Sequence, residues 1–169
     1  MNPDLHLRSR ELAHQLSRQL GVALQARGWR VTTAESCTGG GVASAITDIA
    51  GSSEWFEYGF VTYANRAKES LLGVTSAALQ QHGAVSEPVV EQMAEGALRA
   101  AGADLAVAVS GVAGPGGGSA DKPVGTVWFA WADSGETTTA LHRIDGDREQ
   151  VRQQAVIIAL QGLLAKTTV

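Results

Sequence analysis

The segment Ala34-Glu35-Ser36-Cys37-Thr38-Gly39-Gly40-Gly41 places two hydroxyls, one thiol and one carboxylate on four successive residues. An apolar run that predicts a strand precedes it, and a helical pattern begins near its last glycine. A helix start offers unpaired backbone N–H groups and a partial positive charge. Ser36 therefore lies close to donors of the kind that stabilise an oxyanion or hold a phosphate.

Ser36 needs a base to act as a nucleophile, because a serine hydroxyl is weak until a neighbouring group takes its proton. None of the four histidines follows a predicted strand end; they are His6, His14, His82 and His142. Lys68 is the better candidate, since it lies in the first turns of a predicted helix after the second strand. To act as a base near neutral pH it must be uncharged, which requires a pKa lowered by desolvation.

Tyr63 closes the strand that precedes Lys68, where it could relay the proton or orient the lysine. The alternative interpretation is structural: Lys68 is then a solvated helix lysine and Tyr63 a partly buried strand residue. Spacing alone does not decide between the two interpretations.

Cys37 competes with Ser36 for the role of nucleophile, because a thiol at a helix N-terminus can be reactive. A lone buried cysteine is, however, more often structural. Adjacent residues in a strand or tight turn usually point in different directions, so we expect only one of the two to face the site.

The segment Gly111-Val112-Ala113-Gly114-Pro115-Gly116-Gly117-Gly118-Ser119 is the richest in glycine. Such a loop can approach a ligand closely and offer backbone N–H groups to it, although many such loops are plain turns. It matches neither the P-loop pattern nor, in the right context, the dinucleotide fingerprint. The sequence has no H-x-x-x-H, C-x-x-C or carboxylate cluster, so we expect no metal and no cofactor.

Alternating helices and strands must position these residues. Helices are predicted over residues 5–26, 41–49, 66–72, 76–81, 87–101 and 148–165. Strands are predicted over residues 29–34, 58–63, 104–110, 126–132 and 137–144, the last two as a hairpin. This order predicts an α/β fold, a three-layer α/β/α sandwich with a mixed sheet.

Three of the predicted strands end in polar or glycine-rich loops, at Ser36, Tyr63 and Ser110. The carboxyl ends of strands form the ligand crevice of open α/β sheets, so we expect these loops to meet. The second half of the last helix, residues 155–164, is almost wholly apolar. It must be covered, either in the core or at a subunit interface, which suggests a homo-oligomer.

Composition limits the class of protein. The chain has 169 residues, 44% of them hydrophobic, with a formal net charge of −4 and no basic cluster, which argues against nucleic acid as the main partner. It has no apolar run long enough to span a membrane and no signal-peptide character at its N-terminus. Its single cysteine fits a reducing cytoplasm. We therefore expect a cytoplasmic globular domain with a small-molecule substrate.

Six segments together resemble the C-terminal domain family of the competence/damage-inducible protein CinA. They are Thr33–Gly40, Gly59–Asn65, Lys68–Val74, His82–Ser86, Ser110–Gly117 and Lys122–Val127. They occur in one order between about residues 10 and 165, and the resemblance implies that residues 1–169 form a single domain of this type. Stand-alone members of the family are nicotinamide-nucleotide amidases, which convert nicotinamide mononucleotide to nicotinate mononucleotide and ammonia.

The resemblance also implies a Ser/Lys amidohydrolase mechanism, with Ser36 as nucleophile, Lys68 as base and Tyr63 as the assisting tyrosine. Backbone N–H groups from Thr38 to Gly40 would stabilise the oxyanion, and the loop from Gly111 to Gly118 would hold the ribose phosphate. The substrate-binding residues expected on this basis are Thr38, Gly39, Gly40, Gly111, Ala113, Gly114 and Gly116. The reaction would serve pyridine nucleotide recycling.

Two rival hypotheses remain open at this point. The first is a non-catalytic module of the same family that binds a nucleotide and signals to a partner. The second is a cysteine hydrolase that uses Cys37, which a Cys37→Ala variant would separate from a serine enzyme.

Overall fold

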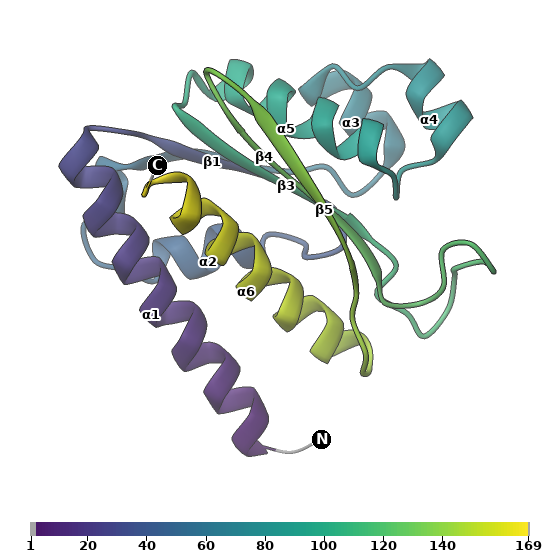
Figure 1. Ribbon diagram of the computed structural model, residues 1–169, viewed down its shortest axis with the longest axis horizontal. Coiled ribbons are helices and arrows are strands. Elements are labelled where there is room, and N and C mark those ends of the chain that lie inside the picture. Colours follow the sequence, from purple (N-terminus) through teal and green to yellow (C-terminus); the bar gives the residue numbers. More distant parts are fainter. Residues whose placement is uncertain (1–2, 169) are drawn as a thin grey trace.

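The computed structural model describes residues 3–168, which form a sheet between two layers of helices (Figure 1). The helices are α1 (Pro3–Arg27), α2 (Gly41–Thr47), α3 (Asn65–Leu72), α4 (Ser76–His82), α5 (Glu87–Ala101) and α6 (Arg148–Lys166), with a 3-10 turn at Ser52–Glu54. The strands are β1 (Val31–Glu35), β2 (Phe56–Val61), β3 (Leu105–Gly111), β4 (Thr126–Asp133) and β5 (Thr137–Arg143). Each predicted helix and strand is present, with its ends shifted by a few residues.

The sheet is mixed, as predicted, with the strand order β2-β1-β3-β4-β5. Strands β2, β1 and β3 are parallel, whereas β4 and β5 form an antiparallel hairpin beside β3. Glu35 at the end of β1 lies beside Val61 of β2 and Val109 of β3. The loops that follow these three strands therefore start at the same edge of the sheet, which confirms that the Ser36 and Tyr63 segments meet.

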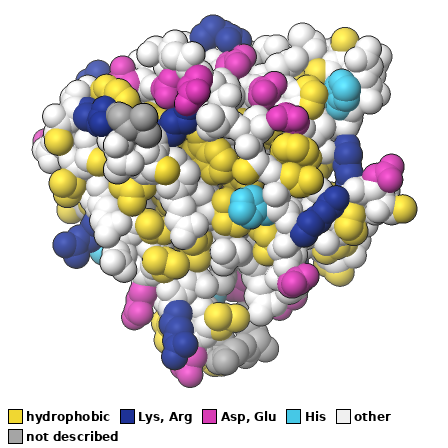
Figure 2. Space-filling model, viewed as in Figure 1, with side chains coloured by type: hydrophobic (Ala, Val, Ile, Leu, Met, Phe, Trp, Pro, Cys, Tyr) yellow, Lys and Arg dark blue, Asp and Glu magenta, His cyan; other side chains and the backbone are white. Residues whose placement is uncertain are grey.

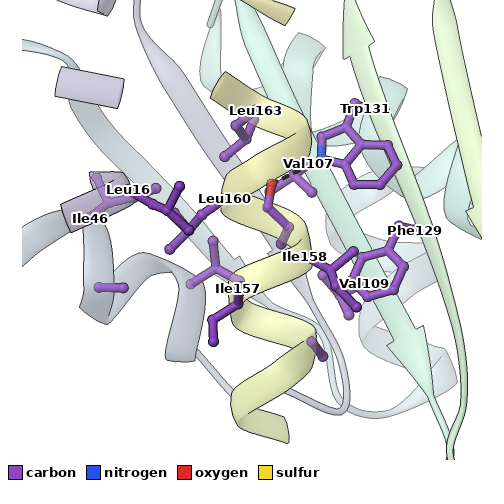
Figure 3. Close-up of a cluster of buried hydrophobic side chains, with 14 of the residues drawn as sticks. Leu16, Ile46, Val107, Val109, Phe129, Trp131, Ile157, Ile158, Leu160 and Leu163 are labelled. Carbon is purple, nitrogen blue, oxygen red and sulfur yellow. Dashed lines mark hydrogen bonds between the residues drawn. The ribbon is translucent and has the colours of Figure 1, made fainter. Parts of the chain in front are cut away.

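Helices α1, α2 and α6 cover one face of the sheet, and α3, α4 and α5 cover the other (Figure 1). The first face holds the larger core, where Leu16 of α1 and Ile157 and Leu160 of α6 pack over sheet residues such as Phe129 (Figure 3). The apolar second half of α6 is thus covered within the chain. The suggestion of a subunit interface at this helix loses its basis, because the core already accounts for its composition.

Side chains cap two of the helices. The Asp147 carboxylate accepts a hydrogen bond from the Gln150 amide and forms a capping box at the start of α6. Thr75 caps α4 by accepting from the Ala78 amide. Asn65 is the first residue of α3, and Ser86 precedes α5 without a side-chain cap because its hydroxyl donates to the Gly83 carbonyl.

Gly96 allows α3 and α5 to lie close together. A Cβ atom built at this position would lie 1.8 Å from the main-chain oxygen of Leu72, the last residue of α3. No side chain fits at that distance, so only glycine permits this approach. The helix that carries Lys68 is therefore packed directly against α5 in the same helical layer.

The surface carries charges of both signs. On the face shown in Figure 2, basic and acidic side chains are interspersed among polar and apolar atoms. None of the helices within residues 3–168 combines the length and apolar character needed to cross a membrane.

Candidate active site

Ser36 and Lys68 lie in direct contact at the edge of the sheet where β1 and β2 end. Ser36 is the first residue after β1, and its amide donates to the Val109 carbonyl of β3. Lys68 lies in the first turn of α3, and its Nζ atom is 3.0 Å from Ser36 Oγ. The two residues are 32 positions apart in the sequence, and the parallel pairing of β1 with β2 brings them together.

Lys68 is 1% exposed, so it is not a solvated helix lysine. Burial lowers the pKa of its ammonium group below the ordinary value, because the charged form loses its hydration, while the neighbouring Cys37 acts in the opposite direction. Among the described residues, no carboxylate lies within 4.0 Å of the Lys68 amine. Both conditions favour the neutral amine that a general base requires.

The surroundings of the Lys68 amine leave one direction for accepting a proton. Its Nζ atom donates to the main-chain oxygens of Thr62 at 2.8 Å and Tyr63 at 3.2 Å. A neutral amine has two N–H bonds and one lone pair, so two carbonyl acceptors use both N–H bonds. The lone pair is then left for the third neighbour, the Ser36 hydroxyl.

Tyr63 contributes its backbone to the site. Its carbonyl oxygen accepts from Lys68 and lies 3.5 Å from Ser36 Oγ. Its phenol, which is well exposed, instead accepts a hydrogen bond from Arg148 Nη2 at 3.1 Å. Tyr63 lies two residues beyond β2 rather than in a strand, and its hydroxyl is paired with Arg148 and not with Ser36 or Lys68.

Cys37 is buried beside this pair, and burial raises the pKa of its thiol to about 11. A thiol with that pKa is protonated at neutral pH, and the thiolate is the reactive form. The geometry therefore favours Ser36 over Cys37 as the nucleophile.

Glu35, which sequence reasoning did not single out, holds the turn that carries Ser36. One carboxylate oxygen accepts from the Thr38 hydroxyl at 2.7 Å and the Val42 amide at 2.8 Å, and the other accepts from the Ala43 amide at 3.0 Å. Glu35 is fully buried. Its carboxylate thus caps α2 from inside the preceding strand. A cap is normally expected at the residue just before the helix, so the sequence rule does not identify Glu35.

The amides predicted to form an oxyanion site differ in their availability. The Gly39 amide donates to the Ser36 carbonyl at 3.0 Å, which closes the turn. Within residues 3–168, the amides of Cys37, Thr38 and Gly40 donate to no other residue, although the Cys37 amide lies against its own thiol. The Thr38 side chain is buried and bound to Glu35, so Thr38 has only its backbone to offer a substrate.

The glycine-rich segment follows β3, and part of it forms an exposed loop. Gly111 is still in β3 and pairs with Val127, and Ala113 is buried. No acceptor within the described part of the chain is paired with the amides of Ala113, Gly114 and residues 116–118. This loop, which projects beyond the sheet in Figure 1, therefore has backbone donors to offer a ligand.

Two arginines of α6 join these segments, and sequence reasoning missed both. Arg148 donates to the Gly114 carbonyl at 2.8 Å as well as to the Tyr63 phenol, so it connects the glycine-rich loop to the end of β2. Arg152 donates to the carbonyls of Cys37 and Thr38. The detectable signal was their spacing of four residues, which places both on one face of the helix.

A metal site is not part of this arrangement. Across residues 3–168, no three His, Cys, Asp or Glu side chains are grouped so that they could hold a metal ion.

Comparison with known proteins identifies the family. Residues 13–167 match the CinA C-terminal domain. The chain is 65% identical over 150 residues to the nicotinamide-nucleotide amidohydrolase PncC of Escherichia coli K12, covering 88% of this chain and 91% of that protein. It is 61% identical over 157 residues to the protein of the same description from Enterobacter agglomerans, covering 92% and 96%.

A longer relative and a solved structure agree with this result. A CinA-like protein of Akkermansia muciniphila is 58% identical over 136 residues, which are 80% of this chain and 33% of that protein. The crystal structure of a competence-damaged protein (CinA) superfamily protein from Klebsiella pneumoniae superposes with a TM-score of 0.89 at 46% identity, over 92% of this chain and 98% of that one. The chain belongs to the CinA C-terminal domain family.

Proposed function

We propose that this chain hydrolyses the carboxamide of nicotinamide mononucleotide, giving nicotinate mononucleotide and ammonia, through a Ser36/Lys68 mechanism. The observation that carries the proposal is the buried Lys68 amine, 3.0 Å from Ser36 Oγ and with its two N–H bonds directed to carbonyls. The similarity to proteins described as nicotinamide-nucleotide amidohydrolases supports the choice of substrate. The reaction would return a pyridine nucleotide to its acid form, as recycling requires.

In the first half of the reaction, Lys68 takes the Ser36 proton as Oγ bonds to the carboxamide carbon. A tetrahedral intermediate forms, and its oxyanion accepts hydrogen bonds from amides of the Ser36 turn that donate to no other residue, those of Cys37, Thr38 and Gly40. The protonated Lys68 then donates its proton to the amide nitrogen, the C–N bond breaks and ammonia leaves.

In the second half, a water molecule attacks the acyl-serine ester. Neutral Lys68 accepts a proton from the water and returns it to Ser36 Oγ as the acid product leaves. The same lysine thus serves both halves, and burial, which lowers the pKa of its amine, makes it easier for that amine to give up each proton it gains.

The nucleotide part of the substrate would lie between the glycine-rich loop and α6. The free amides of the loop and the guanidinium of Arg148 are donors suited to a phosphate. Arg148 is therefore the basic side chain that we assign to the phosphate. The Tyr63 phenol, which accepts from Arg148, would help to orient it, rather than relay the proton to Lys68.

A nucleotide-binding module without chemistry is the second candidate. It would use the same loop and Arg148, but it gives no reason to bury a lysine against a serine. The burial of an amine that has no carboxylate partner costs free energy that binding alone does not recover. The catalytic proposal accounts for this cost.

The deciding experiment measures ammonia release from nicotinamide mononucleotide by the purified protein and by Ser36→Ala and Cys37→Ala variants. We expect release by the wild type, loss by at least about a thousandfold in Ser36→Ala, and near-normal release in Cys37→Ala. Nucleotide binding without release by any form would support the module. Loss in Cys37→Ala alone would move the nucleophile to the thiol.

Two predictions from the sequence stand beside this proposal without a test: a cytoplasmic location and a homo-oligomeric state. Sedimentation at micromolar protein concentration would test the second, and a monomer throughout would contradict it.

A further inference from the structure

Arg152 connects the last helix to the turn that carries Ser36. Its Nε atom donates to the Cys37 carbonyl at 3.0 Å, and its Nη2 atom lies 3.3 Å from the Thr38 carbonyl as a second donor. Arg152 is half-buried in the second turn of α6. The guanidinium therefore binds two consecutive carbonyls immediately after the nucleophile, although it is 115 residues from Cys37 in the sequence.

This contact sets the direction of the Thr38 amide. In a trans peptide the C=O and the following N–H lie in the same plane and point in opposite directions. Because Arg152 fixes the Cys37 carbonyl, the Thr38 N–H must point away from Arg152. The preceding carbonyl, that of Ser36, is fixed in the same way by the Gly39 amide, which directs the Cys37 N–H.

Neither of these directed amides donates to another residue within residues 3–168, although the Cys37 amide lies against its own thiol. Two consecutive N–H groups directly after a nucleophile, held in direction and with no partner in another residue, are suited to an oxyanion that exists only during the reaction. One of the two is held by the backbone of the turn itself. The other depends on a side chain from a distant helix.

The charge of Arg152 adds to this effect. Across the described residues, no carboxylate lies within 4.0 Å of its guanidinium, so its charge is not neutralised by an ion pair. A cation on a carbonyl oxygen polarises that peptide and strengthens the N–H on its other side as a donor. An unneutralised positive charge near Ser36 also favours the developing negative charge of the transition state.

We propose that Arg152 is a positioning residue for the oxyanion site: it orients and polarises the Cys37–Thr38 peptide so that the Thr38 amide stabilises the tetrahedral intermediate. This inference rests on the proposed role of Ser36 as nucleophile. Arg152 touches the turn and not the substrate, so its loss should lower kcat and leave KM nearly unchanged. Loss of Arg148, which we assign to the phosphate, should instead raise KM and leave kcat nearly unchanged.

The test uses a probe that does not depend on the nucleotide, an alkyl fluorophosphonate. Ser36 Oγ bonds to phosphorus, the P–F bond breaks, the hydroxyl proton passes to Lys68 and fluoride leaves. The phosphoryl oxygen gains negative charge during this step, so the rate of labelling reports the oxyanion site. Mass spectrometry of intact protein gives the rate for wild type, Arg152→Met, Arg152→Lys and the control Arg18→Met, an exposed arginine of α1.

We expect labelling of Ser36 to slow by about tenfold to a hundredfold in Arg152→Met, somewhat less than the loss of a complete oxyanion donor. Arg152→Lys should recover part of the rate, because an ammonium can bind one of the two carbonyls but not both. Arg18→Met should label at the wild-type rate. Added methylguanidinium should accelerate labelling of Arg152→Ala, which a purely structural role would not produce.

Wild-type labelling rates in Arg152→Met and Arg152→Lys would overturn the proposal. Should Arg152→Met fail to fold, the labelling rates of Arg152→Lys and of Arg152→Ala with methylguanidinium test the same proposal. A wild type that is labelled at Ser36 but releases no ammonia from nicotinamide mononucleotide would contradict the proposed function and leave the positioning role intact. A wild type that is not labelled at all would contradict both.

Discussion

The turn from Glu35 to Gly41 and the loop from Gly111 to Gly118 follow neighbouring strands at the same edge of the sheet but are built in opposite ways. In the turn, three sets of hydrogen bonds fix the chain: those of the Glu35 carboxylate, that of Arg152, and the backbone bond from the Gly39 amide to the Ser36 carbonyl. In the loop, most residues are glycines, residues 115–118 are exposed, and Arg148 supplies the side-chain contact at Gly114.

This difference fits the two tasks in the proposed function. Bond-making at Ser36 would require donors and base held to fractions of an ångström, because small displacements reduce catalysis strongly. Binding a solvated nucleotide would tolerate a looser surface, since a phosphate accepts hydrogen bonds from many directions. The rigid turn is thus suited to the proposed chemistry and the open loop to the proposed recognition.

Among the predictions for the Ser36 turn and its partners, loss of Lys68 should have the largest effect on activity. We expect Lys68→Met to lower kcat by roughly a hundred- to ten-thousandfold, the usual contribution of a general base. Wild-type kcat/KM should rise with pH through the lowered pKa of Lys68 and then level off, since the neutral amine is the active form. A pH profile of ammonia release by both proteins checks this.

The same lysine should appear in the pH dependence of stability. Between its lowered folded-state pKa and its ordinary value of about 10.4, the unfolded chain binds a proton that the folded chain does not. The free energy of unfolding should therefore rise with pH across that window, and Lys68→Met should lose this rise. An equal slope in the two proteins would mean that Lys68 is charged in the folded state.

Loss of Glu35 should come next, as a change in stability. Glu35→Ala leaves the Thr38 hydroxyl and the Val42 and Ala43 amides without an acceptor, at a cost of about 3 kcal/mol in urea unfolding. Glu35→Gln keeps one oxygen and should cost about 1 kcal/mol. The control Glu57→Gln removes only an exposed ion pair with Arg30 and should change stability by less than about 1 kcal/mol.

Loss of Arg148 tests the recognition side. We expect Arg148→Met to raise KM for nicotinamide mononucleotide about tenfold, in line with a charge-assisted phosphate contact, with kcat nearly unchanged. Nicotinamide riboside, which lacks the phosphate, is the control substrate. An equal rise in KM for both substrates would contradict contact between Arg148 and the phosphate.

Two glycine substitutions should have the smallest effects, and they should differ. Gly40 adopts a φ of +98°, so Gly40→Ala is strained and should destabilise the protein by about 1–2 kcal/mol. A Cβ at Gly116 meets no atom within 4 Å, and Gly116→Ala should change stability by less than about 0.5 kcal/mol. Thermal unfolding of both variants measures the contrast, and equal losses would mean that the loop is as constrained as the turn.

Most of the fold could be predicted from the sequence because its signals are local. Apolar runs such as residues 105–109 and the Asp147 cap are determined by neighbours in the chain. The Ser36–Lys68 pair could be predicted because both follow parallel strands, whose carboxyl ends meet. The composition of α6 does not predict a subunit interface. An apolar helix must be covered, but its composition does not say whether the same chain or a second subunit covers it.

The rest of the site depends on contacts that no local pattern encodes. Arg152 meets the Ser36 turn across 115 residues, and Arg148 meets Tyr63 across 85. In the sequence both resemble solvated arginines of a polar helical turn. The Tyr63 phenol was expected near Lys68, but the chain leaves β2 before Tyr63, so the side chain departs from the strand alternation. Only the tertiary arrangement reveals these partners.

The close approach of α3 to Gly96 gives a residue of the neighbouring helix α5 influence over the position of Lys68. Any side chain at position 96 would push against Leu72 and displace the helix that carries Lys68. The distance between Lys68 Nζ and Ser36 Oγ thus depends on the absence of a side chain at position 96. An engineer who wished to change that distance without altering either side chain would begin there.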